Sequence, residues 1–298
     1  MKRSSWCCVF VLLFAGALFS QSSYTYSSID YPSALLTRAF DINDAGTVVG
    51  VFRLPGQENR GFMLRQGKFT ELPPPDPDAG FRAARGINDR DEVVGLFTLN
   101  IDDSEHGFLL SAGSKLRLDF PGASATDGFG VNNRGSIVGS FVDSSGVVHG
   151  WLRRAGSYTQ IDIPGALDTV AFGVNDRAQI VGGWDTAPNT VVGHSFLLAQ
   201  GKVTTYDVPL SVGVGSQFDR INDVGDIVGV FQDNNGTLHG FLLQGGLSGT
   251  FVQIDYPGGR NTRPWGMNNA GQIVGRYTDS NGVDHGFLAQ PASLAKSQ

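Results

Sequence analysis

The nine residues Val131–Gly139 (VNNRGSIVG) are the cleanest copy of a stretch that the chain repeats six times. Each copy has an asparagine that is followed, five to seven residues later, by a β-branched residue, a valine and a glycine. The repeated asparagines are Asn43, Asn88, Asn132, Asn175, Asn222 and Asn268. Successive asparagines are 45, 44, 43, 47 and 46 residues apart, which indicates an array of one structural unit.

Each unit has the composition of short strands joined by tight turns. Glycine contributes 41 of 298 residues, about twice its usual share of roughly 7%, and only 17% of residues are charged. The Asn-Asp/Asn-x-Gly segment is typical of a turn whose last residue is left-handed, the conformation that glycine adopts most easily. Asp91 and Ala178 replace this glycine in two units. A left-handed alanine costs about 1–2 kcal/mol, so we expect Ala178 to be strained.

The strands carry apolar residues on both faces, as in Ile180–Trp184 (IVGGW). A sheet with one face in water would alternate polar and apolar residues, so we expect each small sheet to be covered on both sides. Stacking every unit between two neighbours covers both faces, and radial closure protects the sheet edges. The sequence therefore predicts an all-β fold, a six-bladed β-propeller of four-stranded blades.

The lengths of the links indicate which strand is innermost. The link from each Ile-Asp strand to the next asparagine-bearing strand is the longest, at about eight residues. We therefore interpret it as the crossover from the outermost strand of one blade to the innermost strand of the next. The array begins with an Ile-Asp strand (Thr25–Asp30) and ends with His285–Leu288. We predict that the N-terminal strand completes the last blade and closes the ring.

The first residues have the features of a secretory signal peptide. Lys2 and Arg3 precede the apolar run Trp6–Phe19, which is shorter than the roughly 20 residues that a membrane-spanning helix needs. We predict a signal peptide at residues 1–22, one propeller domain at 23–292, a short tail at 293–298, and a secreted, periplasmic or cell-surface location. Both cysteines, Cys7 and Cys8, lie in the signal segment. The mature chain is therefore expected to have no disulfide and no thiolate metal site.

The charge balance argues against a nucleic-acid partner. Without Lys2 and Arg3, 20 basic residues oppose 28 acidic ones, so the net charge is −8 with histidine neutral. The chain has no cluster of lysine and arginine that would neutralise phosphates. We interpret the acidity as favouring solubility.

Five units have a histidine at one repeat position. These residues are His106, His149, His194, His239 and His285. Equivalent side chains in stacked sheets start about 10 Å apart, whereas zinc ligands lie roughly 2 Å from one ion. We therefore predict no metal site and expect each imidazole to bond a turn or a neighbouring backbone group. Turn-capping roles are likewise expected for the repeated asparagines and for Asp30, Asp119, Asp162, Asp207 and Asp255.

The order of these elements resembles the HAF-repeat family of predicted bacterial extracellular proteins, whose repeats end in a His-Ala/Gly-Phe signature. The matching triplets begin at His106, His149, His194, His239 and His285, and the first unit departs from the signature with Arg60-Gly61-Phe62. The resemblance covers the whole mature chain and implies an exported, propeller-like repeat protein. It brings no established activity, cofactor or catalytic residue.

A ligand site is expected where the repeats differ, at the crossover loops and the starts of the inner strands. The candidate ligand-binding residues are Arg38, Asp41, Arg82, Arg85, Asp219, Arg220, Arg263 and Trp265, and further charged residues in the same segments are Asp127, Asp168 and Arg260. We expect them near one mouth of the central channel, either as a solvated rim over a plugged channel or as a shallow polar pocket. Both signs of charge occur, so the sequence favours neither an anion nor a cation.

The sequence contains no nucleophile elbow, phosphate loop, zinc motif or dinucleotide fingerprint. It therefore favours an exported, non-enzymatic binding or interaction scaffold that needs no cofactor. Trp265 would stack on a carbohydrate, a peptide or another small ligand, and the arginines would donate hydrogen bonds. Two alternatives stay open. One is a hydrolase or lyase for extracellular polysaccharide that uses Asp41 and Asp219, and the other is a purely structural surface protein.

Overall fold

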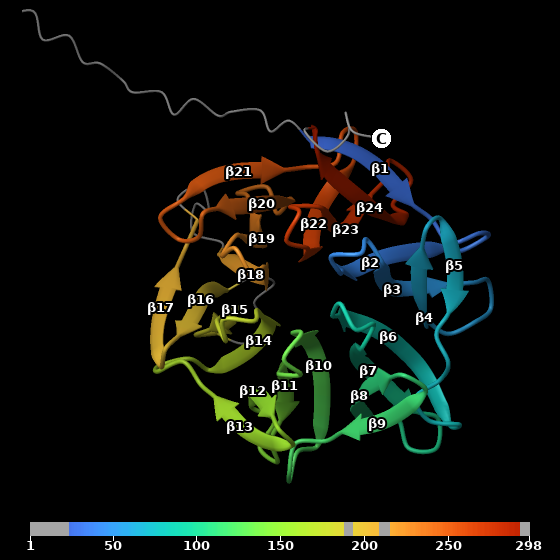
Figure 1. Cartoon of the computed structure of the whole chain (residues 1–298), viewed down its shortest axis with the longest axis vertical. Coiled ribbons are helices and arrows are strands. Elements are labelled where there is room, and N and C mark those ends of the chain that lie inside the picture. Colours follow the sequence, from blue (N-terminus) through green and yellow to red (C-terminus); the bar gives the residue numbers. More distant parts are fainter. Residues whose placement is uncertain (1–23, 188–192, 209–214, 293–298) are drawn as a thin grey trace, which may run out of the picture.

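The computed structural model describes residues 24–187, 193–208 and 215–292, and these residues form a six-bladed β-propeller (Figure 1). The predicted signal peptide (1–22) and C-terminal tail (293–298) lie outside the described residues. Within the described ranges, no helix is long and apolar enough to span a membrane. The predicted fold class, an all-β propeller with six four-stranded blades, is confirmed.

Each blade is an antiparallel sheet, and in blades 1 to 5 the strands follow chain order from the channel outward. Blade 1 contains β2 (Leu36–Ile42), β3 (Val48–Arg53), β4 (Arg60–Arg65) and β5 (Lys68–Glu71). Blade 2 contains β6 (Ala79–Ile87), β7 (Val93–Leu99), β8 (Glu105–Ser111) and β9 (Ser114–Leu118). Blade 3 contains β10 (Ala125–Val131), β11 (Ile137–Val142), β12 (Val148–Arg154) and β13 (Ser157–Ile161).

The remaining blades repeat this arrangement. Blade 4 contains β14 (Asp168–Val174), β15 (Ile180–Asp185), β16 (His194–Ala199) and β17 (Lys202–Tyr206). Blade 5 contains β18 (Ser216–Ile221), β19 (Ile227–Gln232), β20 (Leu238–Gln244) and β21 (Thr250–Ile254). Blade 6 contains β22 (Arg260–Met267), β23 (Ile273–Thr278), β24 (Asp284–Pro291) and β1 (Tyr24–Ile29). The asparagine-bearing strand is innermost, as its long preceding link predicted.

The N-terminal strand closes the ring as predicted. β1 pairs antiparallel with β24 over its whole length, from Tyr24 opposite Pro291 to Ile29 opposite Gly286 (Figure 1). Ile29 is 6% exposed and belongs to an apolar cluster that contains Phe52 of blade 1. The first strand therefore bonds to the last blade and also packs against the first one.

The turn between the two inner strands has the predicted conformation. Its last residue has a positive φ whether it is glycine, as at Gly135 (76°), or not, as at Asp91 (59°) and Ala178 (60°). Both faces of each blade are also covered. In one interface, Val138 of blade 3 packs against Ile180 and Phe196 of blade 4.

The glycine after the repeated valine is required by close packing. A Cβ on Gly182 would overlap the backbone oxygen of Val170 and would lie 2.6 Å from the ring of Phe196. The equivalent glycine in every other blade also faces a carbonyl of the inner strand, together with an aromatic ring of the third strand or, in blade 6, a phenylalanine and Pro264. The glycine of the Val-Gly motif and the aromatic residue that ends the His-Gly-Phe motif thus pack against each other within each blade.

Candidate functional site

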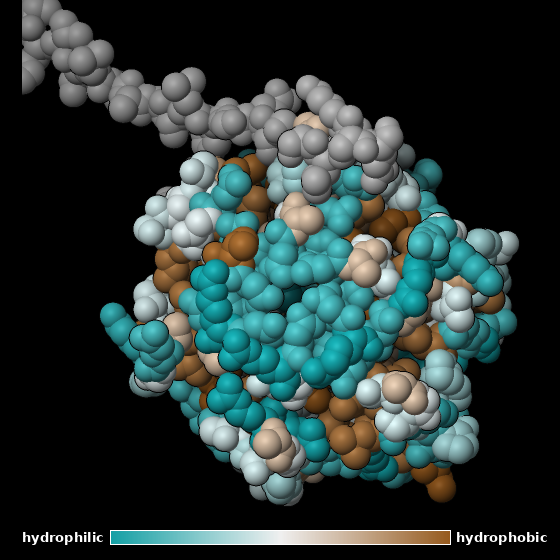
Figure 2. Space-filling model, in the orientation of Figure 1, coloured by the Kyte–Doolittle hydropathy of each residue, from teal (hydrophilic) through white to brown (hydrophobic). Residues whose placement is uncertain are grey.

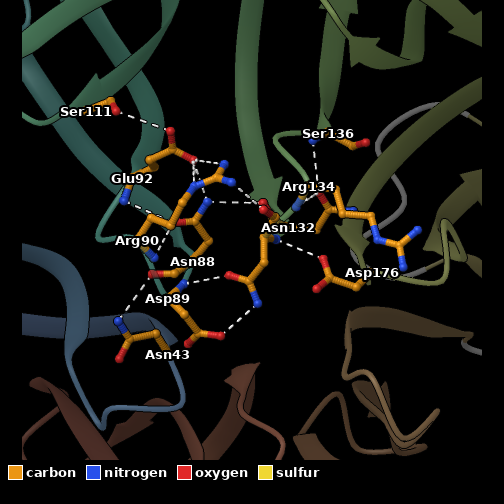
Figure 3. Close-up of polar contacts among 11 residues, drawn as sticks. Asn43, Asn88, Asp89, Arg90, Glu92, Ser111, Asn132, Arg134, Ser136 and Asp176 are labelled. Carbon is orange, nitrogen blue, oxygen red and sulfur yellow. Dashed lines mark hydrogen bonds and ion pairs between the residues drawn. The ribbon is translucent and has the colours of Figure 1, made fainter.

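The repeated asparagines form a closed ring around one end of the channel. The Oδ1 atom of each accepts hydrogen bonds from its own turn, as Asn132 does from the backbone nitrogen of Ser136 at 2.8 Å. Each Nδ2 atom donates to the backbone oxygen of the next blade's asparagine at 2.9–3.3 Å. Figure 3 shows part of this ring, from Asn43 through Asn88 to Asn132. The expected turn role is confirmed, and a contact between blades is added to it.

The residue after each asparagine forms a second closed ring. Its backbone nitrogen donates to the Oδ1 atom of the equivalent residue in the next blade at 2.7–2.9 Å. The members of this ring are Asp44, Asp89, Asn133, Asp176, Asp223 and Asn269. These side chains hold the blades together by hydrogen bonds that recur in every unit. Their regularity gives them a structural role.

A β-bulge interrupts the inner strand of every blade three residues before the asparagine. The ladder register shifts there, so the residue at this position has no partner in the second strand. The bulged residues are Phe40, Arg85, Phe129, Phe172, Asp219 and Trp265. A bulge redirects the side chain and the carbonyl of the extra residue, and all six of these side chains line one cavity in the channel.

This cavity, here called the arginine cavity, has a volume of about 370 Å³. Its lining residues are Arg38, Phe40, Arg85, Phe129, Phe172, Asp219, Arg220, Arg263, Trp265 and Arg276. Figure 2 shows hydrophilic residues gathered around the axis of the ring on the face turned to the viewer. The cavity combines five guanidinium groups and one carboxylate with four aromatic rings.

Arg220 closes the channel below this cavity. Its side chain reaches from blade 5 to Asp41 of blade 1, where Nε lies 3.2 Å from Oδ1. The Nη atoms donate to three bulge carbonyls, those of Arg85 and Phe172 at 3.1 Å and that of Phe129 at 3.4 Å. One guanidinium group therefore contacts four blades and separates the arginine cavity from the asparagine ring.

Glycines make room for this plug. At the position two residues before the repeated asparagine, four units have glycine and the other two have Asp41 and Arg220. A Cβ on Gly130 would lie 2.7 Å from Nη1 of Arg220, and one on Gly266 would lie 2.5 Å from Cα of Asp41. The plug therefore requires one arginine, one aspartate and four glycines at equivalent positions, a pattern that is visible in the sequence.

The arginines of the cavity are held by a small number of carboxylates. Arg38 and Arg276 both pair with Asp284, at 2.5 and 3.0 Å. Burial alone would raise the pKa of Asp284, but the two arginines hold that pKa below its usual value. Arg263 donates to Oδ1 of Asp219 at 3.1 Å. Burial raises the pKa of Asp219, which is only 3% exposed, although Arg263 opposes this shift.

Arg85 stacks on two phenylalanine rings of the cavity. Its guanidinium carbon lies 4.1 Å from the centre of the Phe40 ring and 5.8 Å from that of Phe129. No described carboxylate lies within 4 Å of its nitrogens, and burial lowers its pKa to about 10. Asp127 lies nearby, where burial and the charge of Glu105 raise its pKa to about 7.

The structure places six of the eight candidate residues in the arginine cavity. Asp41 and Arg82 lie elsewhere. Asp41 accepts a hydrogen bond from the backbone nitrogen of Ile87 at 3.0 Å and lies on the far side of the plug. Arg82 donates to Glu71 at 2.7 Å, between blades 1 and 2. Both signs of charge occur in the lining, as the sequence indicated, but it contains five arginines and one carboxylate, an imbalance that the sequence did not reveal.

The sequence reasoning missed four lining residues. Phe40, Phe129 and Phe172 occupy the same repeat position as Trp265, which the sequence argument did select. Arg276 lies on the second strand of blade 6, where the other units have a small or apolar residue. Among the further charged candidates, Asp168 caps the backbone nitrogen of Val148 at 2.9 Å.

Each histidine pairs with the aspartate at the end of the outer strand. The pairs, with Nδ1–Oδ distances of 2.7–3.0 Å, are His106–Asp119, His149–Asp162, His194–Asp207, His239–Asp255 and His285–Asp30. Arg60 and Glu71 replace this pair in blade 1. Nδ1 of each imidazole thus pairs with a carboxylate and not with a backbone group, whereas the predicted turn contact is found at Nε2 of four histidines. Nε2 of His106 bonds Oγ of Ser104 at 2.8 Å, and those of His149, His239 and His285 lie 3.4–3.6 Å from the turn residues Asp143, Asp233 and Asp279. Among the described residues, no cluster of three or more His, Cys, Asp or Glu could hold a metal ion.

No protein-family model matches the chain, and no curated protein matches it. Solved structures do resemble its fold. TolB from Acinetobacter baumannii aligns with a TM-score of 0.55 and 11% identity over 82% of this chain, and this chain spans 63% of that protein. AofleA from Arthrobotrys oligospora gives 0.53 and 11% identity over 89% of this chain and 86% of that chain.

A mutant of the Aleuria aurantia lectin, in complex with alpha-methyl-L-fucoside, gives a TM-score of 0.51. The two chains are 9% identical, and the alignment covers 91% of this chain and 96% of the lectin. Similarity at this level of identity concerns the fold alone. It agrees with the six-bladed propeller built above from the repeat.

Proposed function

We propose that the protein is an exported, non-enzymatic binding protein whose arginine cavity holds a small extracellular ligand of the carbohydrate class. The observation that carries this proposal is the cavity itself. Its floor is the Arg220 plug, and its wall is built from one bulge residue of every blade. Side chains fixed on rigid inner strands make a preformed site, and 370 Å³ lies within the usual range of ligand pockets, about 300–1,000 Å³.

The ligand class is supported by the chemistry of the wall. Trp265 packs against Phe40 with ring centroids 4.5 Å apart and ring planes tilted by 44°, which places apolar ring surface beside arginine donors. Sugars offer both an apolar ring face and hydroxyl groups, so they match such a surface. The Aleuria aurantia lectin, which shares the fold, was crystallised with a fucoside. The signal-like residues 1–22 and the HAF-like triplets support export.

The two alternatives have less support. A hydrolase would need a pair of carboxylates in the cavity, yet Asp41 is bound by Ile87 and Arg220 beyond the plug. Asp219 is the one carboxylate in the described lining. A purely structural role would fit a channel without any concavity, whereas the arginine cavity persists above the plug.

A glycan array and a peptide library screened with the purified protein test this proposal. We expect binding to glycans and a loss of at least about tenfold in affinity when Arg263→Ala and Trp265→Ala are combined. Arg154→Ala, an exposed arginine at the end of β12, is the matched control and should bind like the original protein. Binding that the double variant leaves unchanged would place the ligand elsewhere, and the absence of glycan binding would refute the carbohydrate class.

A further inference from the structure

The arginine cavity has more positive charge than its own carboxylates neutralise. Five arginines line it, and three carboxylates lie within 4 Å of them: Asp41, Asp219 and Asp284. Five minus three leaves a net excess of two positive charges among the described residues, because Arg38 and Arg276 share Asp284 and Arg85 has no carboxylate within 4 Å. The chain as a whole is acidic, with a net charge of −6, so this local excess runs against the overall charge. A ligand that carries a negative charge would compensate it.

The hydrogen-bond donors that would bind the negative charge of a ligand belong to two neighbouring arginines. Arg263 and Arg276 both flank Trp265, with guanidinium carbons 5.5 and 5.7 Å from the ring centre. Asp284 and Asp219 engage only part of each guanidinium group, and Nε of Arg263 is buried without a hydrogen-bond partner. Two guanidinium groups beside one aromatic ring suit a carboxylate attached to a ring that stacks there.

A second observation favours a ligand that also donates hydrogen bonds. Oδ1 of Asp219 accepts from Gln217 at 2.8 Å and from Arg263 at 3.1 Å, whereas its Oδ2 atom is buried and has no partner. Asp219 is 3% exposed and lines the cavity. A buried acceptor without a donor is costly, and a hydroxyl group of a ligand would satisfy it. Inorganic anions such as phosphate or sulfate have fewer hydrogen-bond donors for this acceptor than a polyhydroxylated ring has.

Together these features define a ligand that has a carboxylate, a hydroxyl donor and a ring face. We infer that the ligand of the arginine cavity is a sugar acid of the uronate type, with its carboxylate on Arg263 and Arg276, one hydroxyl on Oδ2 of Asp219, and its ring against Trp265. This inference rests on the proposed function and specifies its ligand. It also accounts for why an arginine stands at position 276, on a strand that contributes no other lining residue.

Isothermal titration calorimetry of the purified protein at low salt tests this assignment. The probes are the methyl glycosides of glucuronate and galacturonate, their neutral counterparts methyl glucoside and methyl galactoside, and inorganic phosphate. We expect at least one uronate to bind at least about tenfold more tightly than its neutral counterpart, because charge-assisted bonds to arginine form only with the acid.

Two variants separate the contributions of charge and hydroxyl. Arg276→Gln should weaken uronate binding about tenfold and leave the neutral glycosides unaffected, while Asp284 keeps Arg38 as its partner. Asp219→Asn keeps the side-chain volume and should weaken both kinds of glycoside without weakening phosphate. Arg154→Gln, which removes one positive charge from an exposed position of blade 3, is the matched control and should change nothing.

The outcomes distinguish the two proposals. Equal affinity for acidic and neutral glycosides, unaffected by Arg276→Gln, would overturn the sugar-acid assignment and leave the carbohydrate site standing. Phosphate binding as tight as uronate binding, with no effect of Asp219→Asn, would reduce the cavity to a simple anion site and also overturn the assignment. Binding of no glycoside at all, here and on the array, would overturn the proposed function itself.

Discussion

A single side chain, repeated once per blade, holds the centre of this propeller together. Asn132 is 5% exposed, caps its own turn through Oδ1 and bonds the next blade through Nδ2. The two roles require an amide, because a carboxylate could cap the turn but could not donate to the neighbouring carbonyl. This requirement explains why all six units keep asparagine at this position.

Asn132→Asp separates these two roles. The change keeps the turn acceptor, removes the 2.9 Å bond to the backbone oxygen of Asn175 and sets a carboxylate oxygen against that carbonyl, which keeps only its 3.0 Å bond from the backbone nitrogen of Ala178. We expect the free energy of unfolding to fall by about 2 kcal/mol in urea denaturation. Asn281→Ser is the control, because it lies in an exposed turn where blade 3 has Ser145. Equal losses in both variants would show that the contact between blades contributes nothing.

Ala178→Gly tests the strain in one turn. Ala178 has a φ of 60°, which an alanine adopts at a cost of about 1–2 kcal/mol and glycine adopts freely. We expect the variant to be more stable by about 1 kcal/mol, after allowance for the greater chain entropy of glycine in the unfolded state. Ala270→Gly, one residue before a turn glycine and without positive φ, should be destabilising. A lower melting temperature for Ala178→Gly would contradict the strain.

At the scale of the strand, the bulge decides what the inner strand presents to the channel. Without the register shift, the residue three before the asparagine would keep its ladder partner in the second strand. With it, six side chains of four residue types line the arginine cavity, and the carbonyls of three of these residues bind Arg220. The repeat thus supplies a constant frame, and the bulge supplies a variable position in that frame.

The contact between the second and third strands leads to a prediction of its own. Gly182→Ala would force a methyl group against the carbonyl of Val170 and the ring of Phe196, so we expect a loss of about 3 kcal/mol in urea denaturation. Gly61→Ala is the matched control. Its Cβ would meet neighbours only at 3.5–3.7 Å, and blade 4 has Ser195 at the equivalent position. A stable Gly182→Ala variant would disprove the packing argument.

At the scale of the molecule, buried and exposed carboxylates change the stability of the fold in opposite directions as pH changes. Burial raises the pKa of Asp41 to about 6, although Arg220 opposes it, and raises that of Asp127 to about 7. Both values exceed the unfolded pKa of about 3.9, so the folded state binds more protons than the unfolded state between about pH 4 and 7. The stability from these groups is therefore lost as pH rises through that range.

Exposed carboxylates act in the opposite direction. Hydrogen bonds from Ser145 and the backbone of Val147 lower the pKa of Asp143 to about 2, so its contribution is lost as pH falls below about 4. We expect the melting temperature to be highest at about pH 4–5 and Asp127→Asn to flatten the decline toward pH 7. The exposed Asp78→Asn is the control. A melting temperature that rises steadily up to pH 7 would contradict this prediction.

The sequence by itself determined the number of blades, their phase and the closure of the ring. These follow from local physics repeated six times: turn residues such as Gly135 and Ala178, the Val-Gly packing step, and a first strand that has the pattern of an outermost one. It also marked Arg85, Asp219 and Trp265 as positions where the units differ. Such features are readable because each depends on residues that are close in the chain.

Only the tertiary structure decided what the channel residues do. Arg220 bonds residues 48, 91 and 135 positions away, so no local pattern could assign it to the plug rather than to the pocket. The same holds for Asp41, which pairs with Arg220 in the plug, and for Arg276, which reaches the cavity from a second strand. Closing the ring brings six inner strands together around one axis. Charged residues that are scattered along the sequence, and that have both signs, then line a cavity in which arginine predominates.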